Sequence, residues 1–372
     1  MKQKLLTYIT YQTFPAETAN SLQTISNIKY FVKNGFKVSL YFPLRDKSSS
    51  DNIDKISEYY SVDKDFKIFG LKHNLPFGKI KFLEPIWFHI SHFLWSRRNV
   101  NNILKTSKND EIYFTRSDWV LYFLVKKNKN VIFECHQVSK IRNFVLSRVA
   151  KNKNVKVIFL NKTLKENYKH LNLKSIVLHS AVDPDLFLER NIVDKNEKKV
   201  VFVGSLLRFG KARGVDFIIK AFTEYNDLKD YTLEIIGGPK EEAEKLKNLL
   251  LEEDVENISI TGRLDRKSTI KKIQESSIGI LINSDESMHS REFTSPLKYF
   301  EYIYGGLAVV AADFPSHRIL PNSEMIKYFT IGNFDEFIES VLTSNVERKE
   351  TNLTKISLDY RAKEIIKFIE ST

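Results

Sequence analysis

The chain has 372 residues, 42% apolar and 28% charged, which is ordinary for a globular protein and long enough for two domains. The sequence has no apolar run near the ~20 residues of a membrane-spanning helix, and its one cysteine, Cys135, rules out an intrachain disulfide and fits a reducing cytoplasm. The formal net charge of +12 is uneven, because residues 1–190 hold 32 Lys and Arg against 16 Asp and Glu, whereas residues 191–372 hold 26 against 30.

The first half alternates short apolar runs with stretches of helical periodicity, which is the pattern of βα units on a parallel sheet. Residues 5–10 predict a buried first strand rather than a signal peptide. Residues 18–34 predict a helix that ends at Gly35, since their apolar residues recur at helical spacing. Further strands are expected at residues 37–41, 67–69, 111–115, 131–134 and 156–160.

The second half repeats this alternation. Strands are expected at residues 199–203, 232–236, 258–261, 279–282 and 308–311, with helices at 215–225, 240–253, 268–275 and 296–304. Two doubly wound α/β domains are the simplest architecture. We place the boundary in the polar stretch 189–198, so that domains cover residues 1–190 and 191–355, and a C-terminal helix over 356–372 returns to the first domain.

The polar loop after the strand at 279–282 leads to a helix that is the first candidate for a binding site. Ligands of open α/β sheets bind at the carboxyl ends of the strands. Ser295 is predicted to cap this helix and Pro296 to take its first position. Free backbone N–H groups and the helix dipole at that end would attract a diphosphate.

This helix carries a family resemblance. The segment SPLKYFEYIYGGLAVVAADFP, residues 295–315, closely resembles the donor-binding segment of family 4 GT-B glycosyltransferases. The resemblance implies two Rossmann-like domains facing across a cleft, and it implies that Glu301 hydrogen-bonds the ribose hydroxyls of a nucleotide sugar. The residues implied to bind the donor at the start of the helix are Thr294, Ser295, Pro296 and Leu297.

The spacing of the acidic residues departs from the family pattern. The family places a first Glu eight positions before the second, but Phe293 stands eight positions before Glu301. Glu292, one residue earlier, is our candidate for the contact with the donor sugar, reached through a bulge in the loop.

A second resemblance lies in VVFVGSLLRFGKARGVDFIIKAF, residues 200–222. It is similar to the family's strand–loop–helix, in which two basic residues clamp the donor diphosphate. The resemblance implies this role for Arg213, while Ser205 stands where the other cation usually follows the first Gly. Arg208 or Lys211 would then supply the second charge, and fixed cations of this kind stabilise the departing diphosphate.

Weaker similarities extend the alignment. In residues 257–283 it implies that the backbone near Gly262 and Arg263 lies beside the nucleotide base. Residues 178–187 look like the family's linker segment, and residues 14–21 like its opening loop near the acceptor. His136 matches a family histidine that points into the interdomain cleft, to bond the donor sugar or to orient the acceptor hydroxyl.

The resemblance implies a retaining glycosyltransferase that uses a UDP- or GDP-sugar as co-substrate, requires no other cofactor and closes around its substrates. We expect Arg213, His136 and Glu292 to be catalytic, and no metal, since Asp183-Pro184-Asp185 lies between the domains. The acceptor is expected to be a surface polysaccharide, a lipid-linked oligosaccharide or a glycolipid. The alternatives are a sugar-nucleotide 2-epimerase of the same fold and a degenerate, sugar-nucleotide-binding subunit.

The basic first half suggests that it faces an anionic partner, either a membrane surface or a charged acceptor. The protein is expected in the cytoplasm and, in the first case, at the inner face of the cytoplasmic membrane. An AT-rich genome would also favour lysine, and nucleic-acid binding has no recognisable motif here. Residues 76–100 are aromatic and basic, with Trp87, Phe93 and Leu94 at helical spacing before Arg97 and Arg98. This stretch predicts either an interfacial helix or a helix packed inside the first domain.

Overall fold

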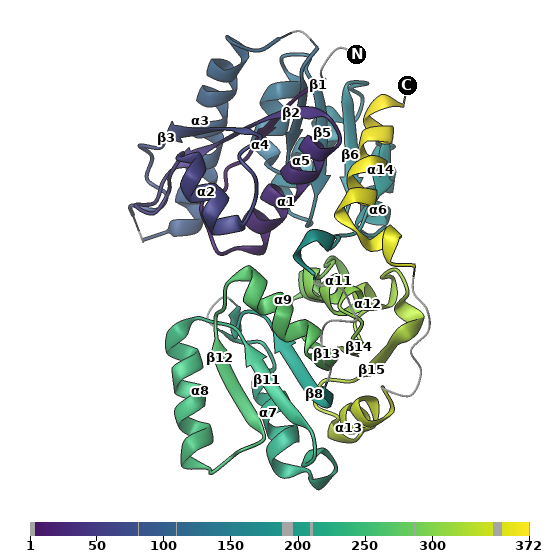
Figure 1. The fold of residues 1–372 in the computed structure, drawn as a ribbon. Coiled ribbons are helices and arrows are strands. Elements are labelled where there is room, and N and C mark those ends of the chain that lie inside the picture. The colour runs from purple at the N-terminus through teal and green to yellow at the C-terminus, as the bar shows by residue number, and fades with distance from the viewer. Residues whose placement is uncertain are drawn as a thin grey trace. The chain divides into compact units, whose positions relative to one another are not determined.

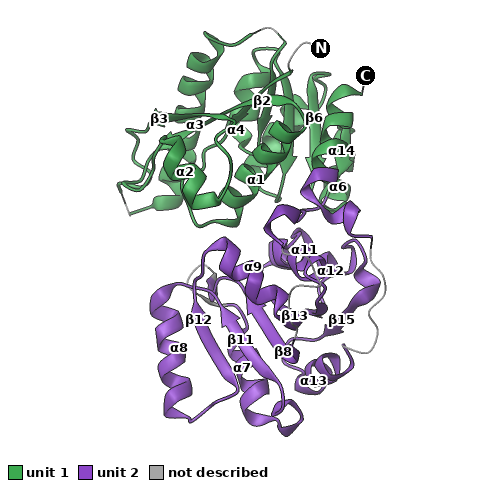
Figure 2. Cartoon of the chain, in the orientation of Figure 1, with its two compact units in different colours: residues 1–178, 361–372 green, residues 179–360 purple. Residues whose placement is uncertain are grey.

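The computed structural model describes residues 4–80, 82–108, 110–187, 196–208, 211–285, 287–344 and 352–371. The chain forms two compact units (Figure 2): unit 1 comprises residues 1–178 and 361–372, and unit 2 comprises residues 179–360. Each unit is a parallel sheet covered by helices, as the sequence predicted. None of the helices in the described ranges is both long and apolar enough to cross a membrane.

Unit 1 contains a seven-stranded parallel sheet with the order β3-β2-β1-β4-β5-β6-β7 (Figure 1). Its strands are β1 Lys4–Ile9, β2 Phe36–Leu44, β3 Lys67–Lys72, β4 Ile112–Thr115, β5 Asn130–Cys135, β6 Val155–Phe159 and β7 Ser175–Val177. Its helices are α1 Ala19–Lys33, α2 Ile53–Tyr60, α3 Glu84–Leu104, α4 Asp118–Val125, α5 Lys140–Val149 and α6 Lys162–Asn167.

Helix α1 shows how local sequence sets these elements. The Thr18 side chain accepts a hydrogen bond from the Ser21 N–H at 3.1 Å and so caps the helix. The helix ends before Gly35, whose φ of +85° lies in the left-handed region that glycine adopts without strain. Ile25, Ile28 and Phe31 are buried at helical spacing, so the predicted amphipathic helix is confirmed.

Unit 2 contains a six-stranded parallel sheet with the order β12-β11-β8-β13-β14-β15. Its strands are β8 Asn196–Val203, β11 Thr232–Ile236, β12 Ile258–Gly262, β13 Ser276–Leu281, β14 Ala308–Ala312 and β15 Ile326–Phe329. Its helices are α7 Val215–Glu224, α8 Lys240–Glu252, α9 Arg266–Gln274, α10 Met288–Glu292, α11 Leu297–Tyr304, α12 Pro315–Arg318 and α13 Phe334–Thr343. A short antiparallel ribbon joins β9 Leu207–Arg208 to β10 Lys211–Ala212.

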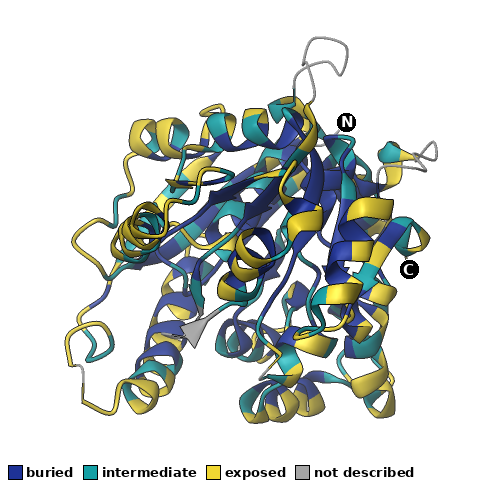
Figure 3. Ribbon diagram, turned by 90° about the horizontal axis from the view of Figure 1, so that it is seen from below, coloured by how far each residue is buried: buried dark blue, intermediate teal, exposed yellow. Residues whose placement is uncertain are grey.

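The sheet of unit 2 is buried on both faces. Val200 and Phe202 point into a cluster with α7, α8 and α13, whereas Val201 and Val203 point into a second cluster with α9 and α11. Figure 3 shows the buried strands in dark blue beneath helices whose outer faces are exposed. Continuous apolar strands of this kind are typical of parallel sheets.

The first division between the units falls after Leu178, before the boundary at residue 190 that the polar stretch suggested. The segment that follows is held by unit 2: the Ser180 N–H donates to Ser295 Oγ at 2.9 Å, and Val182 pairs with Ser357. Residues 188–195, within the expected boundary, lie outside the described residues.

The chain returns to unit 1 within its last helix, α14 Leu358–Glu370. The later part of α14 lies beside β6 (Figure 1), where Lys156 Nζ donates to the Phe368 carbonyl oxygen at 2.8 Å.

Candidate functional site

The candidate donor site lies where the strand order of unit 2 reverses. Strand β8 has β11 on one side and β13 on the other, and ligands of open α/β sheets bind at the carboxyl edge beside such a reversal. The loops after β8 and β11 touch closely there, since a Cβ atom on Gly237 would lie 1.8 Å from the Gly204 carbonyl oxygen. Only glycine at position 237 permits this approach of the two backbones.

The Arg213 side chain lies at the point where the strand order of the sheet reverses. Its Nε donates to Asn283 Oδ1 at 3.1 Å, so a side chain that precedes α7 reaches the loop after β13. A Cβ atom on Gly204 would lie 3.8 Å from Arg213 Nη1, which places the guanidinium over the end of β8. A guanidinium held at this edge is suited to a diphosphate, because its planar donors match phosphate oxygens.

The other residues of this loop divide into two groups. Ser205 has a structural contact, since its Oγ donates to the Leu207 carbonyl oxygen at 2.6 Å. Arg208 and Lys211 pair through their backbones in the β9–β10 ribbon, but their side chains lie outside the described residues. Their proposed contacts with the diphosphate therefore stay predictions.

The start of α11 differs from the prediction by one position. Pro296 is the N-cap, with extended backbone angles, and Leu297 is the first helical residue. Ser295 does not cap the helix, because its Oγ instead accepts the Ser180 N–H and lies 3.4 Å from His179 Nδ1. Thr294 Oγ1 lies 3.0 Å from Ser316 Oγ and donates to the Ser290 carbonyl oxygen, so both hydroxyls hold the loop that leads into α11.

Glu301 is buried between two cations. Arg266 Nη2 lies 2.6 Å from Glu301 Oε1, and Lys298 Nζ lies 2.7 Å from Oε2. Burial alone would raise the pKa of Glu301, but Arg266 and then Lys298 outweigh it and lower that pKa to about 2. The carboxylate is therefore ionised, and its remaining lone-pair sites can accept hydroxyl hydrogen bonds.

Only one of these two cations could have been found from the sequence alone. Lys298 stands three residues before Glu301 on the same helix, a spacing that places two side chains together. Arg266 lies on α9, and its contact depends on the packing of α9 against α11.

The remaining residues expected at the donor site follow strands β12 and β13 of the same sheet. Arg263 follows Gly262, which has a φ of +75° at the end of β12. A Cβ atom on Gly238 would lie 3.6 Å from Arg263 Nε, so Arg263 borders the loop after β11. Glu292 is the last residue of α10 and is half-buried, and the next side chain, Phe293, is buried.

In unit 1, His136 belongs to a buried charged network at the end of β5. Its Nδ1 lies 2.6 Å from Arg116 Nη2, and its Nε2 lies 3.1 Å from Glu134 Oε2, without the alignment of a full hydrogen bond. Burial and then the charge of Arg116 lower the pKa of His136 to about 3. The ring is neutral near pH 7, with both nitrogens directed at protein groups.

Glu134 joins this network to the C-terminal helix. Arg361 forms an ion pair with Glu134 and donates to Asn27 Oδ1 at 3.0 Å. Burial opposes ionisation of Glu134, but Arg361 and the other cations outweigh it and hold its pKa well below the usual range. The sequence could not indicate Arg361, which lies 227 positions from Glu134.

A second buried pair fixes the loops on either side of His136. Arg142 Nε donates to Asp118 Oδ1 at 2.7 Å, and Nη2 lies 3.3 Å from Oδ2. The same guanidinium donates to the carbonyl oxygens of Gln137 and Arg116. This bidentate pair therefore holds the strand ends that carry Arg116 and His136.

The predicted helix at residues 76–100 is α3, and its aromatic residues lie on the packed side. Trp95 is 1% exposed and contacts Tyr11 with ring centroids 5.5 Å apart. Phe93 packs edge-on against Trp119 at 4.8 Å. Of the two possibilities for this stretch, a packed helix describes the Trp95 side, because Trp95 is buried and Phe93 is half-buried against α4. Contact of the helix with a membrane stays a prediction.

Sequence comparisons find similarity to known proteins in the second unit. Residues 197–343 match a family model described as "Glycosyl transferases group 1". An uncharacterized glycosyltransferase of Methanocaldococcus jannaschii is 25% identical over 205 residues, which cover 55% of this chain and 46% of that protein. The match thus spans about half the length of this curated relative.

Solved structures resemble the chain over nearly its whole length. A trehalose-6-phosphate protein from E. coli bound with UDP-2-fluoro glucose has a TM-score of 0.67 at 10% identity, covering 99% of this chain and 100% of that one. Sucrose-phosphate synthase from Thermosynechococcus elongatus has a TM-score of 0.66 at 12% identity, covering 98% and 94%. A lipopolysaccharide outer core galactosyltransferase has a TM-score of 0.62 at 15% identity, covering 99% and 100%. These likenesses show the GT-B fold.

Proposed function

From the match of residues 197–343 to the group 1 glycosyltransferase family and from the GT-B fold, we propose that the chain is a retaining glycosyltransferase. Its donor is a nucleotide sugar, with UDP or GDP as the nucleotide. Its acceptor is a surface polysaccharide, a lipid-linked oligosaccharide or a glycolipid, met at an anionic membrane. The E. coli structural neighbour bound with UDP-2-fluoro glucose supports a UDP-sugar as the first donor to test.

The hydrogen bond from Arg213 to Asn283 carries this proposal, since it holds a cation at the reversal of strand order. We propose that the donor diphosphate contacts Arg213 and the first turn of α11. The ribose hydroxyls bind Glu301, whose carboxylate is already ionised. The base lies beside Gly262 and Arg263, and Glu292 contacts the sugar.

In the proposed reaction the nucleoside diphosphate is the leaving group, and the protein must stabilise its negative charge. As the bond between the sugar C1 and the diphosphate oxygen breaks, negative charge grows on the diphosphate, and Arg213 stabilises it. An oxygen of the leaving diphosphate takes the proton of the acceptor hydroxyl, and the hydroxyl oxygen bonds C1 on the same face. The products are a glycoside with retained configuration and a nucleoside diphosphate.

Unit 1 is proposed to bind the acceptor, with His136 as a neutral group held by Arg116 and Glu134. Both imidazole nitrogens face protein groups, so we propose that His136 takes no proton and orients the substrates only through the groups that it holds, Arg116 and Glu134.

The test is incubation of the protein with UDP-, GDP- and ADP-sugars and a panel of polysaccharide, lipid-linked oligosaccharide and glycolipid acceptors, after a thermal-shift screen selects the nucleotide. Transfer is expected to release free nucleoside diphosphate together with a new glycoside, and the anomeric configuration of the product reports retention. An isomerised donor would identify an epimerase instead, and binding without turnover would identify a degenerate subunit. Either result would overturn the proposal.

A further inference from the structure

Helix α3 exposes a stripe of large apolar side chains. Six of the thirteen exposed large apolar side chains in the described residues lie between Ile80 and Leu94. Ile86, Ile90 and Leu94 are 50%, 42% and 41% exposed and recur every fourth residue, so they share one face of the helix. The opposite face of α3 is the packed one. An apolar row of this length on a surface marks an interaction site.

The stripe runs into a basic region. Arg97 and Arg98 follow Leu94 by three and four residues, so they continue the same face, and both are exposed. Neither side chain has a hydrogen bond or ion pair within the described residues, and the same holds for the Lys72 side chain at the end of β3. The one acid of α3, Glu84, is its first residue, at the far end of the helix.

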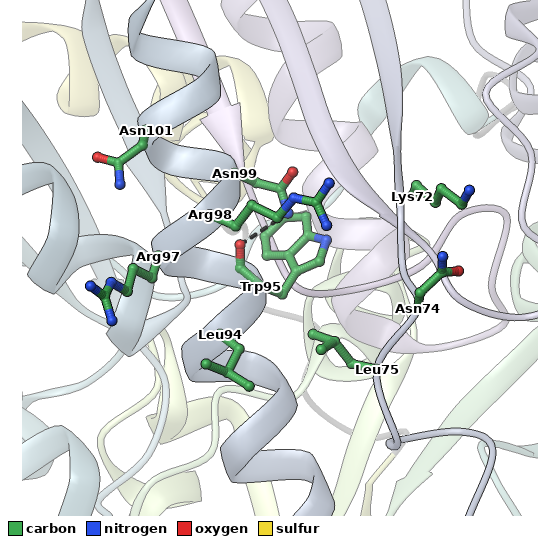
Figure 4. Close-up of a pocket in the computed structure, with 9 residues that line it drawn as sticks. All are labelled: Lys72, Asn74, Leu75, Leu94, Trp95, Arg97, Arg98, Asn99 and Asn101. Atoms are coloured by element: carbon green, nitrogen blue, oxygen red, sulfur yellow. Dashed lines mark hydrogen bonds between the residues drawn. The ribbon is translucent and has the colours of Figure 1, made fainter.

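A cavity of about 410 Å³ lies between α3 and the segment after β3. Leu94, Trp95 and Arg98 line it from the helix, and Lys72, Asn74 and Leu75 line it from the other side. Figure 4 shows Arg98 extending toward Lys72 and Asn74 above the Trp95 ring, with Leu94 and Leu75 below. The cavity therefore has a cationic, amide-bearing end and an apolar end that is continuous with the stripe.

We propose that this surface binds an anionic phospholipid bilayer, with a lipid phosphate between Lys72 and Arg98 and with Ile86, Ile90 and Leu94 in the interfacial region. Two unpaired cations and an amide match the charge and the acceptor oxygens of a phosphodiester. Aliphatic side chains beside them match the acyl chains that adjoin every lipid phosphate. A soluble phosphate would use the cationic end but would leave the apolar row uncovered.

Membrane binding by this surface deepens the proposed function. It rests on that function in one respect, because a membrane-bound acceptor is the reason for the enzyme to bind a membrane. All the residues that carry it belong to unit 1, and none is among the proposed donor contacts. A failure of lipid binding is therefore distinguishable from a failure of sugar transfer.

The test is co-sedimentation of the full chain with vesicles of phosphatidylcholine alone and of phosphatidylcholine mixed equally with phosphatidylglycerol. The wild type is expected to bind the mixed vesicles. Since each cation near an anionic surface contributes about 5-fold to partitioning, Lys72→Ala/Arg98→Ala should weaken binding roughly 25-fold. Ile86→Ser/Ile90→Ser should weaken it roughly 10-fold.

The matched control is Lys151→Ala/Lys153→Ala, which removes the same charge from exposed positions in the turn between α5 and β6. This variant should bind like the wild type. Equal losses in both charge variants would mean that net charge alone acts, which contradicts the proposed cavity. Unchanged binding in Ile86→Ser/Ile90→Ser would contradict insertion of the stripe.

Two further outcomes would overturn the proposal. The first is tight binding of inorganic phosphate, abolished in Lys72→Ala/Arg98→Ala, without vesicle binding. The second is a concentration-dependent dimer, seen by analytical ultracentrifugation, that Ile86→Ser/Ile90→Ser abolishes. Because the substituted side chains are exposed, thermal unfolding of the variants should match the wild type, and this check separates lost binding from misfolding.

Discussion

Arg266 Nη2 lies 2.6 Å from Glu301 Oε1, and this contact joins α9 to α11 at one edge of the unit 2 sheet. Lys298 holds the other carboxylate oxygen at 2.7 Å. The carboxylate is thus fixed and ionised before any ligand arrives, which is the condition for precise hydrogen bonding to a diol. If Glu301 binds the ribose as proposed, Arg266 and Lys298 are positioning residues that act through its carboxylate.

Replacing Glu301 with Gln should weaken donor binding more than turnover. The amide keeps the shape but cannot neutralise Arg266 and Lys298, and one of its two polar atoms is a donor. We expect the donor KM to rise about 10-fold with kcat changed less than that, and stability to fall by roughly 2–4 kcal/mol. Steady-state kinetics and urea unfolding would measure the two effects. An unchanged donor KM would contradict the proposed ribose contact.

Replacing Arg266 with Met tests whether Arg266 positions Glu301, separately from the contact between Glu301 and the ribose. The variant removes one partner of Glu301 but leaves the carboxylate and Lys298 in place. We expect the donor KM to rise and kcat to stay near the wild-type value, with Arg266→Lys recovering much of the loss. A fall in kcat with an unchanged KM would show instead that Arg266 acts in the transition state.

Replacing Arg213 with Ala should lower kcat more than it raises the donor KM, which is the opposite of the pattern expected for the Glu301 and Arg266 variants. If Arg213 stabilises the charge on the leaving diphosphate, its loss should lower kcat by a factor of ~100, the usual scale for one transition-state donor. The matched control is Lys220→Ala on α7, an exposed residue paired with Glu224, which should be neutral. Near-wild-type turnover of Arg213→Ala would remove the role assigned to it.

The local patterns in the sequence predicted α1, α11 and most of the strands, but not β7 or β15, because apolar periodicity and glycine stops are local signals. They could not predict contacts that the fold creates. Arg266 is 35 positions from Glu301, and Arg361 reaches Glu134 only because α14 returns to unit 1. Ser295 was expected to cap α11, but a tertiary hydrogen bond from Ser180 takes its hydroxyl.

Helix α3 shows a different limit of sequence reading. Both of its faces carry large apolar residues, so periodicity alone could not tell the packed face from the exposed one. The aromatic residues were the obvious candidates for a membrane, yet Trp95 is buried while Ile86 and Ile90 are exposed. Only the neighbouring α4 and the loop after β1 decide which face is covered.

Three buried or half-buried histidines predict how the stability of the fold depends on pH. Burial, the largest cause in each case, lowers the pKa of His92 and of His136 to about 3 and that of His317 to about 4. In the unfolded chain each would titrate near 6.5. The unfolded state therefore binds more protons below pH 6.5, and the free energy of unfolding should fall as the pH drops toward 4.

His92 offers the sharpest test of this mechanism. It stacks on Tyr11, with ring centroids 4.5 Å apart, and its buried Nε2 has no hydrogen-bond partner within the described residues. His92→Phe keeps a flat ring there and removes the titration. Near pH 7 the variant should match the wild type within about 1 kcal/mol. Below pH 6.5 the free energy of unfolding of the variant should rise relative to that of the wild type, by up to about 1.4 kcal/mol per pH unit. Urea unfolding at pH 7 and pH 5 measures the free energy of unfolding of both proteins. An equal fall in the two proteins between these pH values would show that His92 does not titrate in this range.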